Sequence, residues 1–283
     1  MRVKAIKDLS QLTDDGLFET IAEGLANILD NARRLFKDSE QLVSSHSVQG
    51  ARILRNVAEE EAAKFLILVD AVRCPRDPAD RFVRQLGRFN EHLAKGLYSR
   101  SCDWSPATLG QLQEYLDSHR ENFYLDGPNG VDWIFRNDIL QWREEILYVD
   151  YIETDDNHIW LHPGRFVNDL GLSLRGLRPG ALRICEALSS CGVATPQGLG
   201  VVALVWRGDS ASIAREMTWP ELRELNQRTL KELERKGLFQ EDALEVGAEA
   251  IDRWQFPLYD LDLATIDIDR AVLRERQRNW FPY

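Results

Sequence analysis

QGARILRNVAEEEAAKFLILVDAV, residues 49–72, is the stretch that decides the fold of this 283-residue chain. Its apolar side chains recur every three or four positions, and this spacing places them on one face of an α-helix. The prolines Pro75 and Pro78 follow directly and prevent the helix from continuing. The stretch therefore predicts one long amphipathic helix with a buried face.

The segments on either side carry the same helical spacing. Residues 14–44 and 79–98 each place apolar side chains on one face, and short turns separate them from the central helix. Three long helices joined by short turns are typical of a helical bundle. Two shorter helices are predicted over residues 106–119 and 131–146.

A β-hairpin is predicted after these helices. Residues 146–163, ILYVDYIETDDNHIWLHP, crowd β-branched and aromatic side chains on both sides of a polar Asp155-Asp156-Asn157 turn. Beyond Pro163 the signals alternate between helix and loop. There the clearest helix is predicted to begin at Thr218 and to end at Gly237.

Thr218 is followed three residues later by Glu221, which is the spacing of a capping box at a helix start. A glycine at the other end is typical of a helix terminus. The ending TLKELERKGLF, residues 229–239, also resembles the step from recognition helix to wing in a winged helix. An ordinary bundle helix and a winged-helix-like region that reads DNA both stay open.

The sequence therefore predicts a mainly α fold in three parts. Residues 1–125 form a helical bundle, and residues 126–165 add a helix and a β-hairpin packed on that bundle. Residues 166–283 form a mostly helical C-terminal region.

The composition excludes several classes of protein. A net charge of −11 argues against broad nucleic-acid binding and makes DNA an unexpected partner, although it leaves room for a local basic cleft. With no apolar run of about 20 residues and no signal peptide, the chain is expected to be cytoplasmic and to have no membrane partner. Its four cysteines form no metal-ligand or disulfide pattern, and no nucleotide-binding glycine motif is present, so no metal or cofactor is predicted.

Two of the predicted helices carry a cluster of ionisable side chains. Glu61 falls at the edge of the apolar face of residues 49–72, where a buried carboxylate needs a cationic or hydrogen-bonding partner. Residues 79–98 carry a basic stripe that ends at an imidazole. The stripe consists of Arg81, Arg84, Arg88, His92 and Lys95. If the two helices pack antiparallel, Glu61 or Glu60 would meet Arg88 or His92.

Such a set is sufficient for acid–base chemistry on a phosphodiester without a metal. His92 would move a proton to or from the ribose 2′-hydroxyl, while Arg88 and Lys95 would offset charge on the phosphate. The predicted catalytic residues are His92, Arg88, Glu61 and Lys95. The predicted RNA-binding or partner-binding residues are Arg84, Asn90, Glu60 and Lys64. The alternative interpretation is a solvated basic face and a structural ion pair.

Five short motifs occur in an order that is similar to a known family. They are NARRLF at residues 31–36, DSEQLV at 38–43, EEAAK at 60–64, RFNEHLAK at 88–95 and LYVDYIETDDNHIWLHP at 147–163. Together they resemble the bacterial abortive-infection AbiV family, whose N-terminal region is a helical HEPN-type domain. The likeness covers roughly the first 165 residues, with a paired-Glu and Lys motif and a His-x-x-Lys element among the matches.

The resemblance implies a role in defence against bacteriophage, with growth arrest or death of the infected cell. Many HEPN proteins are metal-independent ribonucleases, and others are non-catalytic interaction modules. Their active sites often form across a dimer, so a homodimer is expected. The chain departs from the ribonuclease signature because only three residues separate Arg88 from His92, fewer than in catalytic HEPN domains.

Two hypotheses of function follow, and they differ on whether the chain is an enzyme. The first is an antiphage effector that acts on RNA or translation as a metal-independent ribonuclease. The second is a non-catalytic defence or regulatory protein that binds a phage or host protein. Trp206, Trp219, Trp254 and Trp280 would be interface anchors under the second hypothesis, or else core residues.

Overall fold

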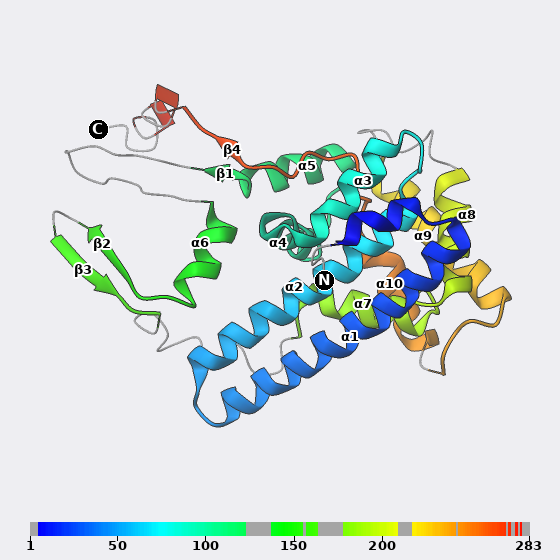
Figure 1. Cartoon of the computed structure of the whole chain (residues 1–283), viewed down its shortest axis with the longest axis horizontal. Coiled ribbons are helices and arrows are strands. Elements are labelled where there is room, and N and C mark those ends of the chain that lie inside the picture. Colours follow the sequence, from blue (N-terminus) through cyan, green and yellow to red (C-terminus); the bar gives the residue numbers. More distant parts are fainter. Residues whose placement is uncertain are drawn as a thin grey trace.

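The computed structural model describes residues 5–122, 137–154, 157–163, 178–208, 217–241 and 243–269, with residues 271–272, 275–276 and 278 (Figure 1). The protein is mainly α, as predicted, with a bundle of helices and one small β-hairpin. No helix in these ranges is long and apolar enough to cross a membrane.

Two long helices form the centre of the bundle. α1 (Asp14–Ser44) and α2 (Val48–Arg73) run antiparallel, after a short 3-10 helix, η1 (Ala5–Gln11) (Figure 1). The Thr13 side chain accepts a hydrogen bond from the Gly16 amide at 3.4 Å and so caps the start of α1. The predicted bounds of both long helices are confirmed to within one residue.

The prediction of one continuous helix over residues 79–98 is wrong. The chain forms α3 (Ala79–Gly87), the 3-10 turn η2 (Arg88–Asn90) and a separate helix, α4 (His92–Ser101). Glu91 adopts an extended backbone and accepts the first hydrogen bond of α4, from the Lys95 amide at 3.1 Å. The basic stripe is therefore divided: Arg88 lies before the break, and His92 begins the next helix.

Next in the chain come α5 (Leu109–Ser118) and α6 (Asp138–Glu145). The helix predicted from residue 131 is seen only in its second part, because residues 131–136 lie outside the described ranges. The predicted hairpin is confirmed: β2 (Asp150–Thr154) pairs antiparallel with β3 (Asn157–Leu161), with Tyr151 opposite Trp160. In Figure 1 the hairpin lies beside α6, at the left of the view.

The C-terminal region is helical, as predicted. It contains α7 (Gly180–Ser190), α8 (Pro196–Gly208), α9 (Trp219–Arg235) and α10 (Ala243–Arg253). The capping box is confirmed by the Thr218 amide, which donates to Glu221 Oε2 at 2.7 Å. Gly237 follows α9 in the left-handed region at φ +69°. Among the described residues, the next helix after that glycine is α10.

One continuous cluster of buried apolar side chains joins the two ends of the chain. Its members include Leu25 of α1, Phe65 of α2, Leu188 of α7 and Trp206 of α8. The division at residues 125 and 165 stays a prediction.

After α10 the chain returns across the bundle. Residues 254–264, which we name the strap, lead to a short parallel pairing of β4 (Ile266–Asp267) with β1 (Glu121–Asn122) (Figure 1). This pairing of segments far apart in the sequence was not predicted. The strap crosses the bundle beside α2 and α3, and buried polar groups hold it there.

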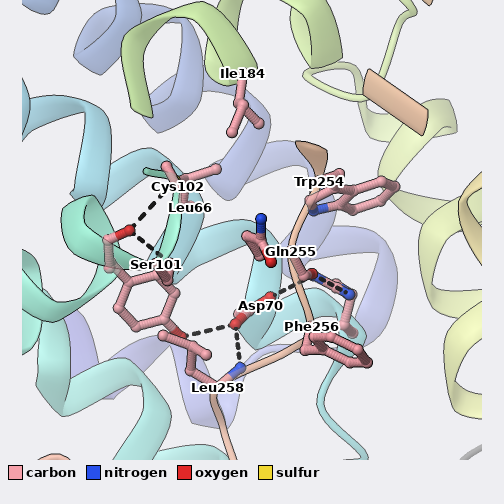
Figure 2. A pocket seen from close by; sticks show the side chains of 11 residues that line it. Leu66, Asp70, Ser101, Cys102, Ile184, Trp254, Gln255, Phe256 and Leu258 are labelled. Carbon is pink, nitrogen blue, oxygen red and sulfur yellow. Dashed lines mark hydrogen bonds and ion pairs between the residues drawn. The ribbon is translucent and has the colours of Figure 1, made fainter. Parts of the chain in front are cut away.

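One of these buried polar groups is the carboxylate of Asp70 on α2. One oxygen is 2.9 Å from Arg73 Nη1, and the other accepts from the Tyr98 hydroxyl and the Leu258 amide, both at 2.8 Å. Figure 2 shows Asp70 lying between Gln255 and Leu258 of the strap. Burial raises the pKa of Asp70, while the charge of Arg73 and these donors act in the opposite direction.

Arg73 is enclosed by the same surroundings. Its Nη2 donates to the Gln255 carbonyl at 3.0 Å, and its guanidinium carbon lies 3.7 Å from the ring centroid of Trp206 and 4.7 Å from that of Trp254. Carbonyl and ring faces both stabilise a cation that water cannot reach. The pair thus joins α2 to α8 and to the strap.

We expect Asp70→Ala to lower the free energy of unfolding by about 3–5 kcal/mol, because it leaves the Arg73 charge buried without its carboxylate. Urea denaturation of the purified protein measures this change. Asp252→Ala is the matched control, since it removes an exposed ion pair with Arg223 at 2.7 Å and should cost less than about 1 kcal/mol. Equal losses in the two variants would contradict a structural role for the buried pair.

Candidate functional site

Glu60, near the middle of α2, gathers three nitrogen-bearing side chains from two other helices. Its Oε2 lies 2.5 Å from Lys95 Nζ and 3.0 Å from His92 Nδ1, both on α4. Its Oε1 accepts from Nε of Arg143, on α6, at 3.1 Å. We name Glu60, His92, Lys95 and Arg143 the Glu60 cluster.

Local sequence explains why these helices meet. His92 and Lys95 lie about one turn apart at the start of α4, so both project toward α2. α6 reaches the same place because α4 carries a glycine at Gly96. A Cβ there would lie 2.2 Å from Cγ2 of Ile139, so only glycine allows the two helices to approach this closely.

The cluster has a buried half and an accessible half. The side chains of Lys95 and Glu60 are 6% and 17% exposed, whereas those of Arg143 and His92 are 34% and 44% exposed. All four line a small pocket of about 40 Å³. That volume takes water molecules but not a nucleotide, so any large substrate would contact the outer half only.

The charges around Glu60 keep its carboxylate ionised. Burial has the largest single influence and would raise the pKa, but the hydrogen bond and charge of Lys95, with the charges of His92 and Arg143, outweigh it. The pKa of Glu60 is therefore held below its ordinary value.

The preceding residue, Glu59, lines the same pocket in a different electrostatic environment. Burial raises its pKa, and its polar neighbours are distant: Ser99 Oγ lies at 3.5 Å and Arg55 Nε at 3.8 Å. Adjacent carboxylates whose pKa values move apart are a common arrangement in acid–base sites.

The surroundings of His92 favour the neutral form of its ring. Burial is the main influence and lowers its pKa, Lys95 and Arg143 lower it further, and Glu60 opposes them, so the ring is neutral near pH 7. A neutral ring that donates Nδ1–H to Glu60 presents the lone pair of Nε2. No residue within the described ranges makes a hydrogen bond to that Nε2, so the lone pair is open to a substrate proton.

A second histidine shows what is distinctive about His92. His119 Nδ1 also contacts a carboxylate, Asp138 Oδ2, at 2.9 Å. Its Nε2, however, is buried without a hydrogen-bond partner, so it is not accessible to a large substrate. Of these two histidine–carboxylate pairs, only the one at Glu60 combines a fixed tautomer with an accessible nitrogen.

The residues predicted to be catalytic are only partly brought together. His92 and Lys95 meet Glu60, which had been assigned to binding. Glu61 instead forms an ion pair with Lys64 on its own helix. Arg88 is 3% exposed and donates to Gln85 and to strap carbonyls, away from the cluster. The catalytic roles themselves stay predictions.

The residues predicted to bind RNA or a partner are similarly dispersed. Arg84 is exposed on α3, with Nη2 at 3.4 Å from the Tyr259 carbonyl. Asn90 is half-buried in η2. Lys64 lies 5.3 Å from the ring centroid of Phe89. None of the three lines the pocket of the Glu60 cluster.

Sequence reasoning missed Arg143 and Glu59. Arg143 lies nearly 50 positions beyond Lys95, in a short helix without a pattern that points to α2. The one local signal was Gly96, because a glycine inside a helical pattern often marks a close approach of backbones. Glu59 was not identified because Glu59, Glu60 and Glu61 are consecutive and differ only in the direction in which their side chains project from the helix.

The family comparison agrees with this region. A family model described as AbiV, of the HEPN_AbiV type, matches residues 20–170, which include the whole Glu60 cluster. No curated protein and no solved structure matches the chain.

We expect Glu60→Gln to lower the pKa of His92 further. The substitution removes the negative charge that favours the imidazolium and leaves the positive charges of Lys95 and Arg143 in place. An NMR titration of the imidazole protons measures the change. A pKa that is unchanged or higher would show that the contact between the two side chains is absent in solution.

The same titration has a consequence for stability. Because the folded-state pKa of His92 lies below its ordinary value, the unfolded chain binds this proton more tightly. This histidine therefore destabilises the fold as pH falls through the ordinary value and toward the folded one. Its contribution is absent above that window.

Gly96→Ala should separate α6 from α4 and lower the free energy of unfolding by about 1–3 kcal/mol, because the new methyl group overlaps Ile139. The Arg143 contact with Glu60 should be lost while that of His92 is retained, which NMR of the two side chains can follow. Gly24→Ala in α1 is the control: its Cβ would lie 3.8 Å from Leu68, an ordinary contact. That variant should be neutral or up to about 1 kcal/mol more stable, and equal destabilisation of both would argue against a tight α4–α6 approach.

Proposed function

Because the chain belongs to the AbiV family, we propose that it is an abortive-infection effector against bacteriophage and that it acts on RNA. The proposed mechanism is metal-independent cleavage at the Glu60 cluster. The observation that carries it is the contact of His92 Nδ1 with Glu60 at 3.0 Å, which leaves Nε2 open to a substrate.

In this mechanism His92 Nε2 removes the proton of a ribose 2′-hydroxyl. The 2′-oxygen attacks the adjacent phosphorus, and the bond from phosphorus to the 5′-oxygen breaks. The products are a 2′,3′-cyclic phosphate and a 5′-hydroxyl end. Glu60 holds the ring in the required tautomer and stabilises the imidazolium that forms.

Arg143 takes the role that sequence reasoning gave to Arg88. Its Nε is bound to Glu60, and no described residue pairs with its two terminal nitrogens. These donors are free to contact phosphate oxygens as negative charge develops. Lys95, which is almost fully buried, is suited to holding Glu60 rather than to touching RNA.

Glu59 is suited to return a proton to the leaving 5′-oxygen. A carboxyl group with a raised pKa stays protonated at a higher pH than an ordinary glutamate, and it lines the same pocket as His92. The proton that His92 takes and the proton that Glu59 gives would balance the reaction. A homodimer and a cytoplasmic location are also part of the proposal.

A second candidate function is non-catalytic binding of a phage or host protein. Exposed aromatic side chains favour it: Tyr148 precedes β2, and Tyr151 and Trp160 contact each other across the hairpin with ring centroids 4.9 Å apart. Exposed aromatic groups of this kind often anchor protein interfaces.

The tryptophans singled out as interface anchors do not form this surface. Trp206 and Trp254 are buried in the core, and Trp219 is partly buried against it. Trp280 lies outside the described residues.

His92→Ala should abolish growth arrest and phage protection and remove new RNA ends that carry a 2′,3′-cyclic phosphate. The expected loss of cleavage rate is about 100-fold or more, because the base is removed. Sequencing of RNA ends after induction measures it, with circular dichroism as a check of folding.

His119→Ala is the matched control, since it removes a histidine–carboxylate pair whose Nε2 is buried. It should keep both cleavage and protection. Full protection by His92→Ala would defeat the ribonuclease proposal. Loss of protection in Trp160→Ala, without loss of RNA cleavage in that variant, would favour the second candidate.

A further inference from the structure

Arg88 holds the strap from within the protein. Its Nη1 donates to the Leu258 carbonyl at 2.7 Å and to Gln85 Oε1 at 2.8 Å, and its Nη2 donates to the Leu261 carbonyl. The side chain is almost fully buried. Both guanidinium ends are therefore committed to protein acceptors, two of which come from residues about 170 positions away in the sequence.

The backbone of the same residue forms the break that precedes His92. The Arg88 carbonyl accepts from the Glu91 amide at 3.0 Å, and Glu91 then turns into an extended conformation. α4 begins at the next residue. His92 thus directly follows a break that begins at Arg88.

The strap is held from both sides at this point. The amide of Leu258 donates to Asp70 on α2, and its carbonyl accepts from Arg88 (Figure 2 shows the Asp70 contact). Tyr98 of α4 donates to the same Asp70 and accepts from Gln85 of α3 at 2.8 Å. One buried network therefore joins α2, α3, α4 and the strap.

We infer that Arg88 is a positioning residue for His92, and that the strap supports the site through its contacts with Arg88, although the strap lies outside the family match, which ends at residue 170. Arg88 acts through the break at Glu91 and does not touch substrate. The inference rests on the proposed function, because a positioning role matters only if His92 acts on a substrate. The position of His92 itself can be measured without an activity assay.

The experiment compares Arg88→Met with Arg81→Gln in the full-length protein. Arg81 pairs with the same strap, through Asp260 at 2.9 Å, but both side chains are about a third exposed. Loss of such a surface pair should change little, so Arg81→Gln controls for a general loss of strap contacts.

We expect Arg88→Met to speed hydrogen exchange of the strap amides at least about tenfold, because buried carbonyls lose their donors and the segment opens more often. The pKa of His92 should rise toward its ordinary value as the ring becomes more hydrated. Arg81→Gln should change neither quantity. Arg88→Lys, which keeps the charge but not the fork of donors, should give an intermediate result, and it serves as the test if Arg88→Met does not fold.

Each other outcome overturns the inference. Faster strap exchange with an unchanged pKa of His92 would make Arg88 a strap anchor only. Lost cleavage with both quantities unchanged would place Arg88 in direct contact with RNA. The proposed function is contradicted by a different result, full protection by His92→Ala. Even then, the hydrogen-exchange and titration measurements still test whether Arg88 positions His92.

Discussion

The buried carboxylate of Asp70 is the constraint on which the rest of the structure depends. A carboxylate inside a protein is destabilising unless a cation and hydrogen-bond donors surround it. Asp70 obtains its cation from Arg73 on the same helix, one donor from Tyr98 on α4 and one from Leu258 in the strap. Because the partners come from separate parts of the chain, the network is complete only when the bundle and the strap are both assembled.

Glu60 is also a carboxylate surrounded by hydrogen-bonding partners, but it lies near the protein surface. It lies ten residues before Asp70 on α2, and its partners Lys95, His92 and Arg143 all come from other helices. Two of its partners, His92 and Arg143, remain partly in contact with water. A paired carboxylate in the interior can only hold segments together, whereas one at the edge can orient an imidazole toward a substrate. Depth of burial therefore separates the structural network from the candidate site.

The break between α3 and α4 connects these two centres. Arg88 belongs to the buried network, and His92, only four positions later, belongs to the site. In a continuous helix the two side chains would share a face, as the basic stripe suggested. Because Glu91 is extended, Arg88 instead contacts the strap and His92 contacts Glu60. The short spacing from arginine to histidine, which differs from catalytic HEPN domains, is consistent with this division of roles.

The sequence by itself determined those elements whose signals are local. The apolar periodicity of residues 14–44 and 49–72, the hairpin around Asp155-Asp156-Asn157 and the capping box at Thr218 each depend on neighbours a few positions apart. The same local motifs also pointed to the family. Proximity along two predicted helices was sufficient to place Glu60, His92 and Lys95 among the site candidates.

Only the tertiary structure decided which of those candidates meet. The apolar spacing continues past Gly87, where α3 ends, and through the extended residue Glu91, so the periodic pattern did not show the break. Distant carbonyls of the strap accept hydrogen bonds from Arg88 at that break. Arg143 reaches Glu60 because Gly96 admits α6, and that contact depends on the distance between helix axes rather than on spacing along the chain. A buried charged side chain needs a partner of opposite charge or a hydrogen-bonding group. Which residue becomes that partner is decided only when distant segments of the chain pack together.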